Sequence, residues 1–410
     1  MKRQRLVVLV SLVVSLCASL AIGQPATRDK LLIAVNRAPQ TVTIYKVAGK
    51  DLTPLKTLPL GKTPRELCLS PDGNIAYVSN GEGNSITVID LVKMAVVTTI
   101  TDPKIKYPDG GVVSPDGKKL YVVGMQSDST IVIDTKTNKV VNEIPLGINV
   151  PRRLVFSPDG KKIYAGCNKT PEIAVIDAAT EKVVGTIPFQ SGIPRRTTLS
   201  RDLKRFYTVE AAMEKVEIID IASRKTIDTF TLSEGNKKVR VRSLEPDPRH
   251  RFLVMVTASA TKLVDRFEIG VPALIQYDLS THKIVRTIPW PNGEERQNAN
   301  ILFSPDGSLM YLFSDQDVLI YETNTFSQVD KWELSKPIEE GFGRLEFGSR
   351  DVLNDEPGFY TSLFNVSDPV QHRRLMGVGR VNLAAKSVDF YTLGPSTPMS
   401  FTLAPGRNVA

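Results

Sequence analysis

The chain has 410 residues, of which 41% are hydrophobic and 23% charged, and its formal net charge is +8. This mild basic excess does not suggest nucleic-acid binding, which usually needs a concentrated basic face. The length is sufficient to bury a large core.

The first 23 residues are predicted to be a signal peptide. A basic start is followed by an apolar run from Leu6 to Leu16, which is short for a membrane span. Small residues then place the cleavage between Gly23 and Gln24. We therefore expect a periplasmic or secreted protein with no membrane span after cleavage. Two alternatives remain open: a lipoprotein at Cys17, although Leu16 before it is not the usual small residue, and an uncleaved membrane anchor.

A four-residue unit, Ser-Pro-Asp-Gly, recurs along the chain. Intact copies begin at Ser70, Ser114, Ser157 and Ser304, and a degenerate copy begins at Ser200. From Ser70 to Ser200 the steps are 44, 43 and 43 residues. A repeat of about 40–50 residues is typical of a β-propeller blade.

The repeat over residues 150–190 predicts the strands of one blade. Residues 151–156 form a first strand, and Ser157–Gly160 a tight turn in which proline presets φ and glycine accepts positive φ. Further strands are predicted over residues 161–166, 172–177 and 182–188. Because no helical periodicity interrupts this pattern, residues 24–410 are predicted to be one all-β propeller domain of four-stranded antiparallel blades.

Eight fourth strands can be counted, which favours eight blades, with seven as the alternative if the irregular last repeat is not a blade. The mature chain opens on a second-type strand over residues 31–35 and closes on a first-type strand over residues 399–403. One blade is therefore expected to combine both ends of the chain, which removes free sheet edges. The alternative is a chain that stops in mid-blade. The fourth strands lie near Leu58, Val97, Ile144, Ile187, Phe230, Ile288, Trp332 and Tyr391.

These motifs resemble a known repeat family. Ser70–Gly73, followed by Tyr77–Asn80 and Val88–Asp90, is similar to the YVTN-type β-propeller repeat. The resemblance implies a secreted or periplasmic binding or scaffold module. Similar repeats occur in lactonase-like propellers, in the propeller subunit of quinone-dependent amine dehydrogenases and in a haem d1 domain. Fold alone does not choose among them.

Two insertions are predicted on the face where fourth strands lead into the next blade, the expected mouth of a central channel. They span residues 261–270 in the sixth blade and 367–374 in the last. The second contains His372 and Arg373, which we take as candidate binding residues because long connections are often functional.

A register of arginines is predicted near the same mouth. Arg65, Arg152 and Arg195 each stand five residues before the turn serine, Arg242 holds the matching position, and Asp109 breaks the series. Guanidinium groups grouped there would attract carboxylates, phosphates or an acidic protein. The alternative is that each arginine pairs with a carboxylate of a neighbouring blade. The candidate ligand-binding residues are Arg65, Arg152, Arg153, Arg195, Arg196, Arg242, His372 and Arg373.

Catalytic signals are weak. The histidines His250, His282 and His372 fall in separate turns and loops, so no metal triad is evident. The recurring serines are predicted to be turn residues rather than nucleophiles. Cys68 and Cys167 lie two blades apart, too far for a disulfide.

We therefore expect a non-catalytic binding protein without cofactor or metal. Its partner would be a protein or a small anionic ligand, and it would be a monomer or part of a hetero-oligomer. The first alternative is the propeller subunit of an amine-dehydrogenase-like redox complex, with the cofactor in another chain. The second, less favoured because few acidic or histidine residues are available, is a lactonase-like hydrolase.

Overall fold

The computed structural model describes residues 30–48, 51–167, 169–200, 202–289, 301–304, 306–313, 317–333, 345–347, 353–355, 358–367, 374–382, 385–394 and 398–404. These residues form strands and turns, and none of them forms a helix that is long and apolar enough to cross a membrane. The predicted signal peptide lies outside the described residues.

The recurring tetrapeptide forms the predicted tight turn. In the fourth blade the Ser157 hydroxyl donates to Oδ1 of Asp159 at 2.6 Å, and the Gly160 amide donates to the Ser157 carbonyl at 2.8 Å. Gly160 has a φ of 69°, in the left-handed region that favours glycine. The serines are therefore turn residues, as predicted.

The same turns also pack against one another from blade to blade. A β-carbon at Gly160 would lie 3.1 Å from Cγ of Pro115 in the preceding turn, and one at Gly307 would lie 3.2 Å from Cδ of Pro248. The proline of one turn thus covers the glycine of the next, so the motif also determines the spacing of neighbouring blades.

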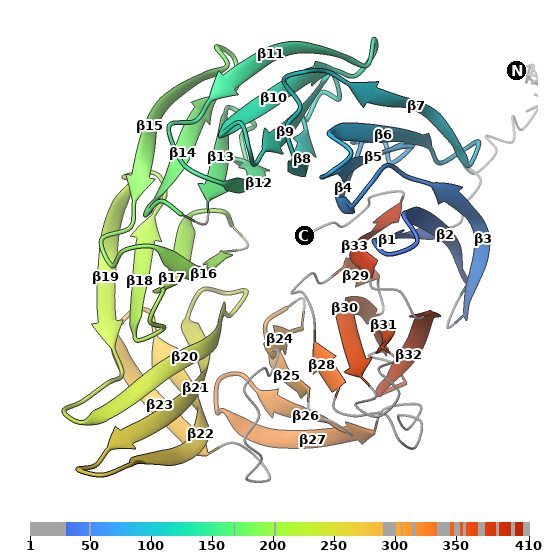
Figure 1. The fold of residues 1–410 in the computed structure, drawn as a ribbon. Helices are drawn as coiled ribbons and strands as arrows, with labels where there is room; N and C mark the ends of the chain where they lie inside the picture. Colours follow the sequence, from blue (N-terminus) through green and yellow to red (C-terminus); the bar gives the residue numbers. More distant parts are fainter. Residues whose placement is uncertain are drawn as a thin grey trace, which may run out of the picture.

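The strands that follow each turn have the predicted order. The fourth blade consists of β12 (Pro151–Phe156), β13 (Lys162–Cys167), β14 (Glu172–Asp177) and β15 (Lys182–Pro188), paired antiparallel in sequence order. Its first strand, β12, lies toward the centre of the ring, and β15 lies at the outer edge (Figure 1).

Eight such sheets are arranged in a ring (Figure 1). The prediction of an all-β propeller with eight blades is confirmed.

The second blade comprises β4 (Pro64–Leu69), β5 (Ile75–Asn80), β6 (Ser85–Asp90) and β7 (Ala95–Thr101), and the third β8 (Pro108–Val113), β9 (Lys119–Gly124), β10 (Ser129–Asp134) and β11 (Lys139–Pro145). The fifth comprises β16 (Pro194–Leu199), β17 (Arg205–Glu210), β18 (Lys215–Asp220) and β19 (Lys225–Thr231), and the sixth β20 (Lys237–Pro246), β21 (Phe252–Lys262), β22 (Phe267–Asp278) and β23 (Lys283–Pro289). The seventh comprises β24 (Ile301–Phe303), β25 (Leu309–Phe313), β26 (Asp317–Glu322) and β27 (Ser327–Glu333).

The eighth blade departs from the four-stranded plan. Its main path is β28 (Leu345–Phe347), β30 (Gly358–Ser367), β31 (Arg374–Asn382) and β32 (Ser387–Gly394). An additional strand, β29 (Leu353–Asp355), also pairs with β30. The sequence pattern did not predict this fifth strand.

The first blade combines the two ends of the chain. β1 (Lys30–Asn36) pairs with β2 (Thr41–Ala48), which pairs with β3 (Asp51–Pro59). On its other side β1 pairs antiparallel with β33 (Pro398–Ala404), in a register that places Ile33 opposite Thr402. The predicted closure is confirmed, and the alternative of a chain that stops in mid-blade is wrong.

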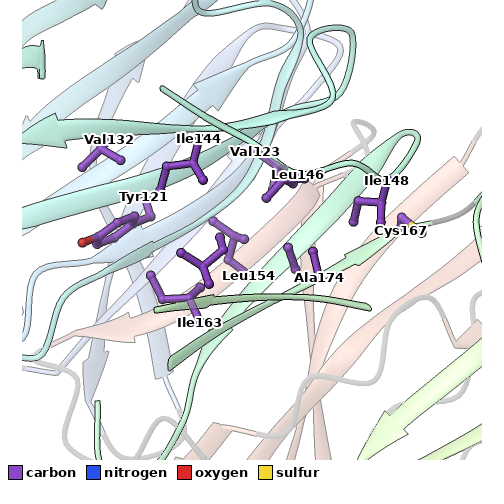
Figure 2. Close-up of a cluster of buried hydrophobic side chains, with 12 residues drawn as sticks. Tyr121, Val123, Val132, Ile144, Leu146, Ile148, Leu154, Ile163, Cys167 and Ala174 are labelled. Atoms are coloured by element: carbon purple, nitrogen blue, oxygen red, sulfur yellow. The ribbon is translucent and has the colours of Figure 1, made fainter. Parts of the chain in front are cut away.

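The hydrophobic core lies between neighbouring blades. One cluster joins Tyr121 and Val132 of the third blade to Leu154 and Ile163 of the fourth, with Cys167 at its end (Figure 2). Such faces can be buried only against the next blade, so the ring is expected to fold as one cooperative unit. Cys68 and Cys167 are both free, as predicted, and burial raises the pKa of the Cys68 thiol to about 12.

The insertion predicted over residues 261–270 is mainly strand rather than loop. It lengthens β21 and β22, and a short turn joins them, closed by a hydrogen bond from the Leu263 amide to the Arg266 carbonyl at 2.8 Å. Alternation in Phe267-Glu268-Ile269 was the available signal for a strand. In the other insertion, residues 368–373 lie outside the described residues.

Candidate functional site

The innermost strands of five consecutive blades carry a β-bulge, near the start of the strand in four of them and in the middle of β20 in the sixth blade. In each blade the irregularity falls at the position of the predicted charge register. A bulge breaks the alternation of a strand and can turn a side chain in a new direction. The residues in these bulges are Arg65, Asp109, Arg152, Arg195 and Arg242.

The backbone before three of these bulges has a conformation that is rare outside glycine. Thr63, Tyr107 and Val150 have φ values of 54°, 49° and 56°, and each precedes a proline. The amides of the last two are held by the preceding blade: Tyr107 donates to Oδ1 of Asn84, and Val150 to Oδ1 of Asp128, both at 2.8 Å. We refer to the side of the ring where these turns meet as the loop face.

A non-glycine residue in this region costs about 1–3 kcal/mol and persists where neighbouring contacts fix it. These three residues were not predicted from the sequence. The repeated pattern of proline followed by Arg or Asp was a signal that could have indicated them.

Arg65, Asp109 and Arg152 form a charged chain across three blades. The Arg65 guanidinium donates from Nε to Oδ1 of Asp109 at 2.8 Å and from Nη2 to Oδ2 at 3.1 Å. Nε of Arg152 lies 2.8 Å from the same Oδ2. The side chain of Asp109 is only 2% exposed, that of Arg65 8%, and that of Arg152 39%. One carboxylate thus serves two arginines and leaves one surplus positive charge.

Besides Asp109, Arg65 is enclosed by Tyr107 and Gly81. Its guanidinium lies 5.5 Å from the centre of the Tyr107 ring, and a β-carbon at Gly81 would approach its Cδ to 2.9 Å. Burial lowers the pKa of Arg65, but the hydrogen bond and charge of Asp109 outweigh it, so the pKa is raised overall. Arg65 is therefore a charged structural residue with little access to solvent.

Arg153 connects blades that are not neighbours in the ring. Its Nη2 lies 3.7 Å from Oε1 of Glu66 in the second blade, across the third. The third and fourth blades approach each other closely at this point, because a β-carbon at Gly110 would come within 2.6 Å of the Arg152 carbonyl oxygen. For Arg65 and Arg152 the structure thus shows the pairing with a carboxylate of a neighbouring blade that was the alternative to a free anion site. Arg153 is also paired, but with a blade that is not its neighbour.

Arg242 has a different environment. It is half-buried, and its Nε is buried without a hydrogen-bond partner among the described residues. Burial, and then the charge of Arg240, lower the pKa of Arg242. No carboxylate is paired with it in the described part of the chain. This guanidinium can therefore accept an external anion without first breaking an ion pair.

The other predicted residues are placed less completely. Arg195 and Arg196 lie in the bulge of β16, but their side chains are outside the described part of the chain. His372 and Arg373 also lie outside the described residues. His250 contacts Asp202 at 3.5 Å and His282 contacts Asp228 at 2.7 Å, each between blades. Among the described residues no group of three metal-binding side chains occurs.

Comparison with known proteins supports the fold. The family model described as "Lactonase, 7-bladed beta-propeller" matches residues 25–184, which is less than half of the chain. That description gives seven blades, whereas this chain forms eight sheets. No curated protein matches.

Two solved structures match most of this chain. Dihydro-heme d1 dehydrogenase NirN in complex with DHE has a TM-score of 0.61 and 16% identity, and the match covers 90% of this chain and 74% of NirN. Hydrazine synthase of Kuenenia stuttgartiensis has a TM-score of 0.48 and 19% identity over 81% of this chain and 96% of that chain. At 16% identity the likeness to NirN concerns the fold alone.

Proposed function

We propose that this protein is an extracytoplasmic β-propeller that binds an anionic small molecule, or an acidic partner protein, at the loop face near the centre of the ring. The observation that carries the proposal is Arg242, a half-buried guanidinium with no hydrogen-bond partner for its Nε among the described residues. A buried charge without a counterion is costly, and a carboxylate or phosphate would remove that cost. The surplus positive charge of the Arg65–Asp109–Arg152 chain also favours the binding of an anion.

The proposed role is binding without catalysis. Guanidinium groups stay protonated at neutral pH and donate several hydrogen bonds in a fixed plane, which suits recognition of an anion rather than proton transfer. The extracytoplasmic location follows from the predicted signal peptide at residues 1–23.

Calorimetric titration tests this proposal, with inorganic phosphate and citrate as probes. We expect at least one probe to bind the wild-type chain and Arg242→Gln to weaken that binding about tenfold or more. Lys93→Gln is the matched control, because it also removes one positive charge but Lys93 is exposed and lies 3.2 Å from Asp90. Equal losses in both variants, or no binding of either probe, would contradict an anion site at Arg242.

A lactonase-like hydrolase is the second candidate, because the family match covers the first four blades in part or whole. Within that segment the acidic residues at the inner bulges are Asp109, which already contacts two arginines, and Glu66, which lies 3.7 Å from Arg153. Turnover of a lactone that is lost in Asp109→Asn, while the variant stays folded, would favour this candidate. The amine-dehydrogenase-like redox role rests on the repeat resemblance, and visible absorbance of the protein copurified with a second chain would favour it.

A further inference from the structure

The sixth blade extends beyond the size of its neighbours. Its strands β20, β21 and β22 have 10, 11 and 12 residues, against 6 in each corresponding strand of the fourth blade. Figure 1 shows β20 and β22 as longer arrows than their counterparts in that blade. We define the sixth-blade extension as residues 237–241, 258–262 and 267–271.

One strand of the extension carries an exposed apolar stripe. Phe267, Ile269 and Val271 are 63%, 66% and 60% exposed. Phe267 and Ile269 alternate along β22 and share one face, and Val271 follows them at the bulge where the pairing with β21 shifts. Exposed aliphatic residues also occur on the outermost strands of other blades, such as Val97 and Val141, but there each stands alone at one position of the repeat. Single exposed residues are ordinary, whereas a contiguous group indicates an interaction site.

Basic side chains border this stripe on the same face. Lys262 is paired directly with Phe267, Ala260 with Ile269, and Lys238 with Ala260 in turn. Residues directly opposite each other in a sheet share a face. Lys238 and Arg240 are both exposed, while Val239 and Val241 between and beside them are buried on the opposite face. The exposed face is therefore apolar along β22 and basic along β20.

The stripe also lies on an unpaired strand edge. β23 pairs with β22 only over Ala273–Asp278, so among the described residues nothing pairs with Phe267–Val271 on that side. The Leu263 amide bonds to the Arg266 carbonyl, and hydrogen-bonded pairs alternate with non-hydrogen-bonded pairs in an antiparallel hairpin. The backbone groups of Phe267 and Ile269 therefore point outward from this edge.

We propose that the sixth-blade extension is a docking site for an extended segment of a partner protein, which adds a strand to the free edge of β22. Outward backbone groups would supply the hydrogen bonds, and the alternating apolar side chains would select the partner's side chains. The basic side chains of Arg240 and Lys262 determine the partner's chemistry: its segment is apolar and flanked by carboxylates. Lys238 already contacts Glu214 of the fifth blade at 3.2 Å. This site does not use Arg242, although the charge of Arg240 acts on that residue, and the proposal holds whether or not Arg242 binds an anion.

Fluorescence anisotropy with labelled synthetic peptides tests the proposal on the mature chain. The probe is a short Val-Thr repeat with Asp-Glu at both ends, compared with the same repeat ending in Lys-Arg and with a version whose valines are N-methylated. We expect the acidic peptide to bind about tenfold or more tightly than the basic one, because charge complementarity favours it. N-methylation should abolish binding, since it removes the main-chain donors.

Variants locate the binding surface. Ile269→Asp should reduce binding of the acidic peptide about tenfold or more, and Arg240→Glu with Lys262→Glu should remove the preference for acidic ends. Val97→Asp is the matched control, because Val97 is 53% exposed on an outer strand and should leave binding unchanged. Circular dichroism confirms that each variant is folded.

Other results would overturn the proposal. Equal binding of the N-methylated peptide, equal binding of the basic peptide, or insensitivity to Ile269→Asp would exclude strand addition at this edge. A dimer that Ile269→Asp dissociates would show that the occupant is a second copy of the chain. Flotation with phosphatidylglycerol vesicles that Ile269→Asp abolishes would show that it is a lipid surface.

Discussion

Arg65 of the second blade and Asp109 of the third hold the same register position in their innermost strands, and they bond to each other through two parallel contacts of 2.8 and 3.1 Å. Positions that the repeat makes equivalent thus carry opposite charges in adjacent blades. Arg152, at this position in the fourth blade, contacts the other side of the same carboxylate. The register is therefore a device that joins blades as well as a source of positive charge.

Removing the central carboxylate should destabilise the ring. Asp109→Asn keeps the size of the side chain but leaves the buried Arg65 charge uncompensated, so we expect the free energy of unfolding to fall by about 3–5 kcal/mol. Urea denaturation measures this change. Glu82→Gln is the control, because Glu82 and Lys62 form an exposed pair and should contribute much less to the free energy of unfolding. Equal effects in the two variants would mean that Asp109 has no special role.

The turn glycines should be sensitive to substitution for two reasons. Gly160→Ala places a β-carbon at positive φ and 3.1 Å from Pro115, so we expect a loss of about 1–2 kcal/mol in the free energy of unfolding. Gly166→Ala is the matched control: a β-carbon there would meet nothing within 4 Å, and the φ of Gly166 is not in the left-handed region. Thermal unfolding of both variants checks this, and a Gly166→Ala loss as large as that of Gly160→Ala would contradict it.

Much of the fold could be predicted because local chemistry repeats at a fixed spacing. Each tight turn is determined by residues within it, as when the Ser157 hydroxyl binds Asp159, so sequence alone identifies it. Closure was predictable because residues 31–35 and 399–403 are complementary strand types. The added strand β29 was not, since three residues carry too little periodicity to indicate a strand.

The candidate site was only partly predictable for a different reason. The register of Arg65, Arg152 and Arg242 is visible in the sequence, but which of them is neutralised depends on distances between blades. Asp109 was interpreted as a break in the series, whereas the structure shows it to be the shared partner of two arginines. An acidic residue at the same repeat position between two arginines was the available signal.

Acid should weaken the turns that close the third strands. Hydrogen bonds from Ser280 and Thr281 lower the pKa of Asp278 to about 2. A carboxylate whose folded pKa lies below its unfolded value of about 3.9 stabilises the fold above that value, and the contribution is lost as the pH falls toward 2. We expect Asp278→Asn to lower the melting temperature at pH 7 and to differ little from wild type near pH 2. Asp265→Asn, in the exposed hairpin turn, is the control and should leave the melting temperature at pH 7 unchanged.

Closure of the ring can be tested by a covalent link between its two ends. Leu31 lies opposite Ala404 in the pairing of β1 with β33, and directly opposite residues on antiparallel strands are close enough for a disulfide. In a background without Cys68 and Cys167, Leu31→Cys with Ala404→Cys should oxidise readily and raise the unfolding free energy by about 4–5 kcal/mol, because the link closes a very long loop. The control is Leu31→Cys with Ser387→Cys. Ser387 lies in β32 of the eighth blade, which does not pair with β1, so this pair should not form a disulfide. Mass spectrometry under non-reducing conditions distinguishes the two, and failure of the first pair to oxidise would contradict the pairing of the chain ends.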